Sequence, residues 1–219
     1  IVQSKEHKQK AEKVIKDTEV DLINIEFFIK KTNRGWLRDS GPVFVKDGSE
    51  IAVIDFKFNA WAKYDDCKFD DKVPLFISKK FNLKRIIAQH NYKQVVLEGG
   101  AMDNNGKGTL ITTEECLLDE KIQIRNAGFT KQDYFEVFKK YLGISNVIWL
   151  GKGIVGDDTH GHVDDLCRFV NEETVVLAEE KNSADHNYNL LKENKERLEN
   201  INLPNGSKLN VISLPMPSP

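Results

Sequence analysis

The sequence predicts an α/β fold in which one unit, two strands followed by a helix and a third strand, is repeated. Helix-like and strand-like segments alternate along all 219 residues. Their pairs recur every roughly 60 to 65 residues, which indicates an internal repeat. No stretch rich in Pro, Gly and Ser divides the chain. We therefore expect residues 1–219 to form a single domain.

The chain opens with the first of these helix–strand pairs, which belongs to an incomplete unit. Residues 4–17 are polar with apolar side chains at helical spacing, and residues 20–29 have the composition of a strand. The first ββαβ unit is then expected at residues 43–45, 51–58, 72–82 and 83–88.

The second unit contains the most clearly marked helix. Thr130 is its expected N-cap, Phe135, Phe138 and Leu142 share one face, and Gly143 ends it. Its strands are expected at residues 94–97, 109–113 and 144–150. The third unit has a helix at residues 185–199 and strands at residues 166–170, 174–178 and 209–214. Such units bury their apolar faces against neighbours, and a closed ring would leave no sheet edge open.

Composition excludes several classes of partner. The formal net charge is −2, from 32 basic and 34 acidic residues without a basic stripe, so we expect neither nucleic acid nor an anionic membrane as partner. No apolar run reaches the ~20 residues of a membrane span, and no signal peptide is recognisable. Three cysteines without a CxxC pair favour a reducing, cytoplasmic location over a disulfide framework.

Three unusual motifs lie where predicted strands end. They are GWLRDSGP at residues 35–42, VLEGG at residues 96–100 and GDDTHGHVDD at residues 156–165. Equivalent junctions converge in a ring of repeats, which would bring Asp39, Glu98, His162 and Asp164 together. Two carboxylates can bind a planar guanidinium, and an imidazole can transfer protons at neutral pH. These residue types suit a cationic, planar, nitrogen-rich substrate.

Simpler interpretations remain open for each motif. Trp36 is equally compatible with a core position, Arg38 with a local ion pair to Asp39, and Glu98 with an ordinary Gly-Gly turn. The acidic residues of the third motif are compatible with a solvated loop.

A metal site is a sharper alternative. His160, His162 and Asp164 alternate, as in the His-x-His-x-Asp pattern that begins zinc sites of the metallo-β-lactamase type. A zinc site needs three protein ligands, and the remaining histidines lack ligand-like spacing. We therefore expect no metal.

Taken together, the motifs resemble those of a known family. WLRDSGPVFV at residues 36–45, LEGG at residues 97–100 and GDDTHGHVDD at residues 156–165 are similar to the signatures of agmatine deiminases and related bacterial peptidylarginine deiminases. The resemblance spans essentially the whole chain. It implies a pseudo-symmetric five-bladed α/β propeller of ββαβ modules, of which about three to four lie in this chain.

The resemblance also implies an activity. It is the conversion of agmatine and water to N-carbamoylputrescine and ammonia, a step toward putrescine, without a cofactor. Asp39 and Asp164 would bind the guanidinium, His162 would act as general acid and base, and Glu98 would hold His162 and the substrate. The further substrate-binding residues would be Trp36, Arg38, Asp158 and His160. Another guanidine deiminase and a non-catalytic guanidine-binding protein remain alternatives, and a homodimer is to be tested.

One family feature has no match. The nucleophilic cysteine of such enzymes lies well beyond the third motif, so we expect this chain to be shortened at both ends and inactive alone. Cys67 and Cys116 lie outside the motifs. Cys167 follows the Asp164–Asp165 pair and is expected to be a small buried residue rather than the nucleophile.

Overall fold

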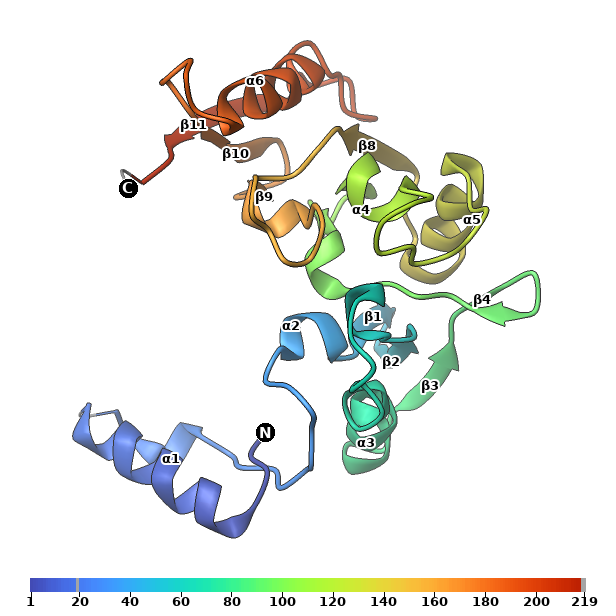
Figure 1. Ribbon diagram of the computed structural model, residues 1–219. Coiled ribbons are helices and arrows are strands. Elements are labelled where there is room, and N and C mark those ends of the chain that lie inside the picture. Colours follow the sequence, from blue (N-terminus) through green and yellow to red (C-terminus); the bar gives the residue numbers. More distant parts are fainter. Residues whose placement is uncertain (19, 218–219) are drawn as a thin grey trace.

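The computed structural model describes residues 1–18 and 20–217. Three small sheets follow one another along the chain (Figure 1). In each, the first two strands are antiparallel, and the third strand pairs in parallel with the second after a helix. The predicted ββαβ order therefore occurs three times in an α/β fold.

The first module consists of β1 (Val43–Asp47), β2 (Glu50–Asp55), α3 (Val73–Lys80) and β3 (Lys84–Ile87). Asp47 pairs with Glu50, so a two-residue turn joins β1 to β2. The parallel pairing of β2 with β3 requires a crossover, which α3 supplies by burying Val73 and Ile77.

The second module consists of β6 (Asp103–Asn104), β7 (Thr109–Thr113), α5 (Lys131–Leu142) and β8 (Asn146–Leu150), with the short α4 (Glu114–Leu118) after β7. Thr130 caps α5 as predicted, and the Thr130 and Asp133 side chains form a reciprocal capping box. Gly143 ends the helix at φ 68°, a left-handed conformation that glycine adopts without strain. The buried face is Tyr134, Val137 and Phe138, whereas Phe135 and Leu142 are only partly buried.

The third module consists of β9 (Cys167–Phe169), β10 (Thr174–Glu179), α6 (Asn187–Leu198) and β11 (Asn210–Pro215). Two apolar clusters join the modules. One unites Ile54 of β2 with Leu110 of β7, and the other unites Ile148 of β8 with Leu177 of β10. Neighbouring modules therefore share their cores, as the repeat argument predicts.

Two predicted strands are wrong. Residues 20–29 contain only the 3₁₀ turn Leu22–Asn24 and a single bridge from Ile29 to Val2, and Ile23 is 82% exposed. These residues find no partner strand that would bury an apolar face.

Residues 94–97 do not form the first strand of the second module, a place taken by β6. Instead β5 (Lys93–Gln94) forms a small hairpin with β4 (Gln89–His90), and Val96 bridges Lys57. Val95 and Leu97 are buried by packing in the core rather than by the module's own sheet. Their apolar character alone did not distinguish these two environments.

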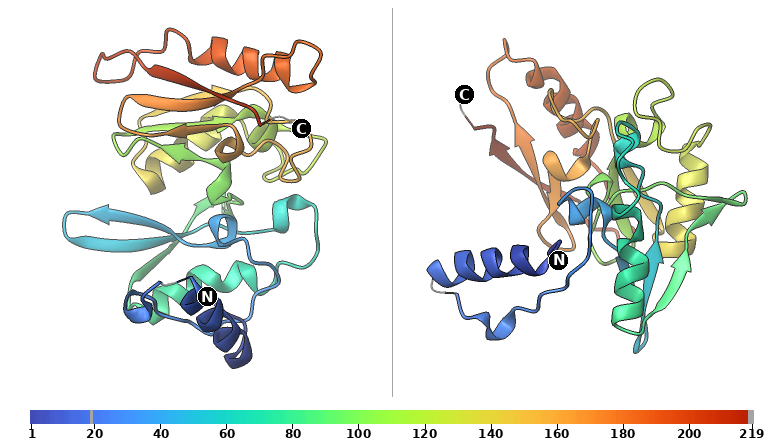
Figure 2. Two further views of the ribbon diagram at one scale, coloured as in Figure 1. Left: turned by 90° about the vertical axis from the view of Figure 1, so that its left-hand side faces the viewer. Right: turned by 60° about the horizontal axis from the view of Figure 1, so that its bottom comes forward.

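Helix α1 (Lys5–Asp17) stands apart from the three modules (Figure 2). Ser4 caps it as its side chain accepts a hydrogen bond from His7, and none of its residues is buried. Phe28, downstream, packs against Phe76 and Phe81 around α3. None of the described helices has the length and apolar content that crossing a membrane requires.

The three sequence motifs meet in this fold. Their backbones form the short helix α2 (Leu37–Ser40) and the 3₁₀ turns η4 (Gly99–Ala101) and η5 (Val163–Asp165). The α2 helix packs against η4, and η4 packs against η5. Motifs that lie in successive repeats of the chain thus come together at one place.

Candidate active site

A cavity of about 350 Å³ lies where the motifs meet. Five carboxylates and two guanidinium groups line it, so its charge favours a cationic ligand. The lining residues are Arg34, Trp36, Arg38, Asp39, Trp61, Asp157, Asp158, Thr159, His162, Asp164 and Asp165.

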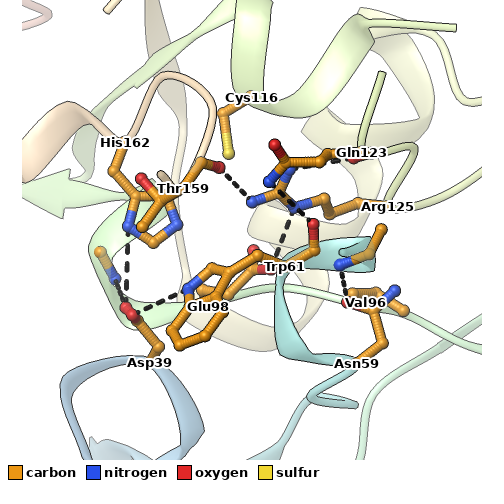
Figure 3. Close-up of polar contacts among 12 residues, drawn as sticks. Asp39, Asn59, Trp61, Val96, Glu98, Cys116, Gln123, Arg125, Thr159 and His162 are labelled. Atoms are coloured by element: carbon orange, nitrogen blue, oxygen red, sulfur yellow. Dashed lines mark hydrogen bonds and ion pairs between the residues drawn. The ribbon is translucent and has the colours of Figure 1, made fainter. Parts of the chain in front are cut away.

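Asp39, His162 and Asp164 form the centre of this cavity. His162 Nδ1 lies 3.8 Å from Asp39 Oδ1 and 3.8 Å from Asp164 Oδ1. The His162 ring is buried, and Asp164 remains partly accessible. Figure 3 shows Asp39 and His162 turned toward each other from α2 and from the loop before η5. Two carboxylates from distant parts of the chain thus flank one imidazole.

Two donors fix the Asp39 carboxylate. Trp61 Nε1 donates to Oδ2 at 3.0 Å, and the Gly100 amide donates to Oδ1 at 3.0 Å (Figure 3). Burial raises the pKa of Asp39, although His162 and these donors act to lower it. A bound cation would favour the ionised carboxylate and offset the cost of burying it.

Gly99 and Gly100 permit this close approach. A Cβ on Gly100 would lie 2.3 Å from His162 Nδ1 and 2.7 Å from Asp39 Oδ1. A Cβ on Gly99 would lie 2.0 Å from the Arg38 carbonyl oxygen. Packing at the site therefore requires glycine at both positions, in addition to the turn that the Gly-Gly pair forms.

Trp61 is a site residue that the sequence did not reveal. Ala60, Trp61 and Ala62 have φ values of 52°, 60° and 52°, three successive non-glycine residues in the left-handed region. Each costs roughly 1–2 kcal/mol relative to an ordinary conformation. Burial of the Trp61 ring and its hydrogen bond to Asp39 act against that cost. No sequence pattern marks such a turn.

The Asp157 carboxylate accepts hydrogen bonds from other residues of the third motif and so holds its loop in shape. Its Oδ2 accepts from the Gly161 amide at 2.7 Å and from the His162 amide at 3.0 Å, and its Oδ1 accepts from Thr159. Burial acts to raise the pKa of Asp157, but these donors hold it below the usual value. The sequence placed this residue only among the acidic residues of a loop.

Glu98 lies behind the cavity in a buried ion pair. Arg125 Nε donates to Glu98 Oε1 at 3.0 Å, and both side chains are fully buried (Figure 3). Arg125 also donates to the carbonyl oxygens of Gln123 and Thr159. Arg125 was missed because it lies in a loop outside every motif, and only tertiary contacts connect it to the site.

Of the other predicted substrate-binding residues, Trp36, Arg38 and Asp158 line the cavity and His160 does not. Trp36 and Arg38 line the cavity, and Arg38 Nε lies 3.4 Å from Asp164 Oδ2. Asp158 lies at its edge, paired with Lys63, and accepts from Tyr64 Oη at 2.8 Å. The hydrogen bonds from Lys63 and Tyr64 lower the pKa of Asp158.

His160 is not brought to the cavity. It has a φ of 63°, and its Nε2 lies 2.8 Å from Asp119 Oδ2. The alternating set His160, His162 and Asp164 therefore does not converge on one point, since the segment is a looped chain rather than a strand. Among the described residues, the group of His, Cys and acidic side chains that could hold a metal is Glu98, Cys116 and His162.

The three cysteines are free among the described residues. Burial raises the pKa of Cys167 to about 12 and also raises that of Cys116. Cys67 is half-buried, and desolvation raises its pKa as well. A catalytic cysteine is normally activated by a lowered pKa, and none of these three has that property.

Comparison with known proteins identifies the family. All of residues 1–219 match the Porphyromonas-type peptidyl-arginine deiminases. Agmatine deiminases of Medicago truncatula and Ectopseudomonas mendocina are 38% and 36% identical over 86% and 91% of this chain, and over 52% and 54% of their own lengths. The chain thus spans about half the length of the curated relatives it matches.

Solved structures agree. A C. jejuni agmatine deiminase, a cysteine-to-serine variant with substrate bound, is 31% identical with a TM-score of 0.78, over 94% of this chain and 58% of that one. An agmatine deiminase of Enterococcus faecalis is 32% identical with a TM-score of 0.78, over 87% of this chain and 52% of that one. The chain belongs to the Porphyromonas-type peptidyl-arginine deiminase family.

Proposed function

We propose that the protein is an agmatine deiminase, which converts agmatine and water to N-carbamoylputrescine and ammonia. One observation carries this proposal: Asp39 and Asp164 flank His162 within 3.8 Å in a cavity rich in carboxylates. A guanidinium between the two carboxylates would form charge-assisted hydrogen bonds and would lie beside an imidazole. The named relatives are agmatine deiminases.

The reaction would proceed in two halves. A cysteine thiolate attacks the guanidinium carbon, and His162 protonates the departing ammonia, which leaves a covalent thiouronium intermediate. His162 then takes a proton from water, the resulting hydroxide attacks the same carbon, and the thiolate leaves with the ureido product formed. Asp39 and Asp164 hold the planar group in place throughout, and Glu98 positions His162 from behind.

We further propose where the substrate's tail lies. Trp36 and Asp158 line the same cavity as Asp39. The aliphatic chain of agmatine would pack on the exposed indole of Trp36, and its terminal ammonium would face Asp158. A conjugated peptide or a free α-carboxylate would not gain from that carboxylate.

The nucleophile would come from a segment that follows residue 219. Support comes from the raised pKa values of the three cysteines here and from the relatives' length, about twice that of the matched region. Further ββαβ modules would then close a five-bladed propeller. Residues 1–219 alone should show no turnover. The free cysteines are compatible with the cytoplasmic location predicted above, and a homodimer is the assembly that we propose to test.

Ammonia release by the full-length protein tests the function. We expect turnover of agmatine, with Asp164→Asn lowering kcat/KM by at least about 100-fold because one side of the guanidinium site loses its charge. Asp65→Asn, at an exposed carboxylate outside the cavity, is the matched control and should leave turnover unchanged. Wild-type turnover by Asp164→Asn would contradict the proposed site.

A second candidate follows from the family itself, which is named for peptidyl-arginine deiminases. Parallel assays with agmatine, free arginine and an arginine peptide distinguish it. A preference for the peptide over agmatine would replace our assignment. Agmatine binding in calorimetry without turnover would instead identify a non-catalytic relative.

A further inference from the structure

A lysine of the protein already pairs with the carboxylate that the proposed function assigns to the substrate's tail. Lys63 Nζ forms an ion pair with Asp158 Oδ1, and Tyr64 Oη donates to Asp158 Oδ2 at 2.8 Å. Lys63 and Asp158 are 95 residues apart in the chain, so only the tertiary fold creates this pair. Both oxygens of Asp158 are therefore in contact with groups of the protein itself.

The left-handed turn at residues 60–62 places this lysine. The turn directs the Trp61 indole to Asp39 inside the cavity, and the residue that follows the turn, Lys63, reaches Asp158 at the edge of the cavity. One segment thus contacts both the carboxylate proposed for the guanidinium and the carboxylate proposed for the tail.

Gln123 holds the two segments of the pair together. Its Nε2 donates to the Trp61 carbonyl oxygen at 3.1 Å (Figure 3) and to the Asp158 carbonyl oxygen at 3.2 Å. A single amide therefore connects the backbone beside Lys63 with the backbone of Asp158. The short separation of the lysine and the carboxylate is a consequence of this connection.

The other cation near Asp158 has a different partner. Arg34 lines the cavity, but its guanidinium pairs with Asp66 and lies 4.1 Å from the centre of the Tyr64 ring. In the described part of the chain, the carboxylate that pairs with Lys63 is that of Asp158. The hydrogen bond to Asp158 raises the pKa of Lys63, so the lysine is charged at neutral pH.

A cationic tail and Lys63 cannot share Asp158 without a cost. Two ammonium groups within about 4 Å of one carboxylate repel each other. The Lys63 and Asp158 side chains are 38% and 60% exposed, so the lysine can rotate away into solvent when a ligand arrives. Exposed ion pairs are weak, and the loss of this one lowers the affinity for such a ligand by a small factor only.

We propose that Lys63 is a specificity-determining residue that competes with a cationic substrate tail for Asp158. This inference rests on the proposed function, in which the terminal ammonium of agmatine faces Asp158. Lys63 weakens the binding of guanidines with a cationic tail and does not affect guanidines with a neutral tail. It therefore reduces the preference of the site for the cationic tail.

Two guanidines with the same four-carbon chain test this inference. Agmatine ends in an ammonium group, whereas n-butylguanidine ends in a methyl group. Calorimetric titration of the full-length protein, with His162→Asn present to prevent turnover, measures the dissociation constant of each. Addition of Lys63→Met should lower the dissociation constant of agmatine by about 2–5-fold and leave that of n-butylguanidine unchanged.

Three further variants in the same background identify the cause. Lys63→Arg keeps the positive charge and should bind agmatine as the protein with Lys63 does. Lys68→Met removes an exposed positive charge from the same loop, outside the pair, and should change neither constant. Asp158→Asn should weaken the binding of agmatine and not that of n-butylguanidine. Thermal unfolding of each variant shows that it is folded.

Unchanged or weaker binding of agmatine by Lys63→Met overturns the inference, since weaker binding would mean that Lys63 holds Asp158 in place for the ligand. An equal gain for both guanidines overturns it as well, because the effect would then not depend on the tail. An Asp158→Asn variant that binds agmatine normally would show that the tail lies elsewhere, which excludes competition for Asp158.

Ammonia release by the full-length protein without His162→Asn separates this inference from the proposed function. Turnover of agmatine together with no effect of Lys63→Met on binding overturns the role of Lys63 alone. The expected effect of Lys63→Met on binding together with no turnover overturns the deiminase assignment and leaves the competition for Asp158 supported.

Discussion

At the scale of single residues, the site depends on how closely polar groups approach one another. Asp39 and His162 are 7% and 2% exposed, and backbone or indole donors hold Asp39. Such a cluster is stable only if each charge has a partner. The two glycines of the LEGG motif provide the space in which these partners meet.

Replacement of Gly100 by alanine tests this packing. The new Cβ would force His162 and Asp39 apart, so we expect kcat/KM for agmatine to fall by on the order of 100-fold. The overpacking should lower the free energy of unfolding by about 1–3 kcal/mol. Kinetics and denaturant unfolding measure the two effects.

Gly35→Ala is the matched control, since nothing lies within 4 Å of a Cβ at Gly35. It should leave both activity and stability near wild type. Unchanged activity in Gly100→Ala would show that the close approach of Gly100 to the His162 ring is not required.

Asp165 offers a prediction about pH. Its side chain reaches solvent, yet partial desolvation and the negative charges of Asp157 and Asp164 raise its pKa from 3.8 to about 6. Because folding favours the protonated form, this group lowers stability above its folded pKa and has no effect below its unfolded pKa. Asp165→Asn should therefore raise the free energy of unfolding at about pH 7, by about 1 kcal/mol after allowance for solvent screening.

The stability that Asp165→Asn gains over the wild type should shrink as the pH falls from about 6 to about 4. Over this range wild-type Asp165 becomes protonated in both the folded and the unfolded state, so its charge no longer lowers the free energy of unfolding. Denaturant unfolding across this range measures it. Asp65→Asn removes the same charge at an exposed position and should give no such pH-dependent gain. A gain that is independent of pH would disprove the assigned cause.

At the scale of elements, local signals predicted helices better than strands. The helix after Thr130 has an N-cap, a periodic apolar face and a terminal glycine, all of which act within a few residues. A strand, in contrast, needs a partner that the local sequence does not specify. Residues 20–29 and 94–97 therefore looked like strands without forming the expected ones.

The α5 cap can be tested directly. Thr130→Ala removes the hydroxyl that accepts from the Asp133 amide and donates to Asp133 Oδ2. We expect a loss of about 1 kcal/mol in the free energy of unfolding. Thr130→Ser keeps a hydroxyl and should restore most of it, while Lys139→Ala on the exposed face should change little. Equal stability of the Ala and Ser variants would refute the capping role.

At the scale of the whole molecule, each module depends on its neighbour for burial. The two apolar clusters both cross a module boundary. In the described part of the chain, β11 is an edge strand, and its Ile212 and Leu214 are 45% and 49% exposed. Unpaired backbone groups beside an apolar surface favour association with another chain.

We therefore expect residues 1–219, when expressed alone, to self-associate. Ile212→Lys combined with Leu214→Lys should reduce the associated fraction in light scattering, because the charges repel a second strand at this edge. Val14→Lys on the exposed α1 is the control and should have no effect. A monodisperse monomer of the unmodified segment would contradict this prediction.

The sequence by itself determined the ββαβ repeat, the capped α5 helix and the three motifs, because periodicity, caps and glycine spacing act locally. It also predicted that Asp39, His162 and Asp164 would meet. Only the tertiary structure decided the roles of Trp61 and Arg125, the turning of His160 toward Asp119, and the pairing of Lys63 with Asp158. Those contacts join residues far apart in the chain, and the geometry of a buried pocket arises only when all modules have packed.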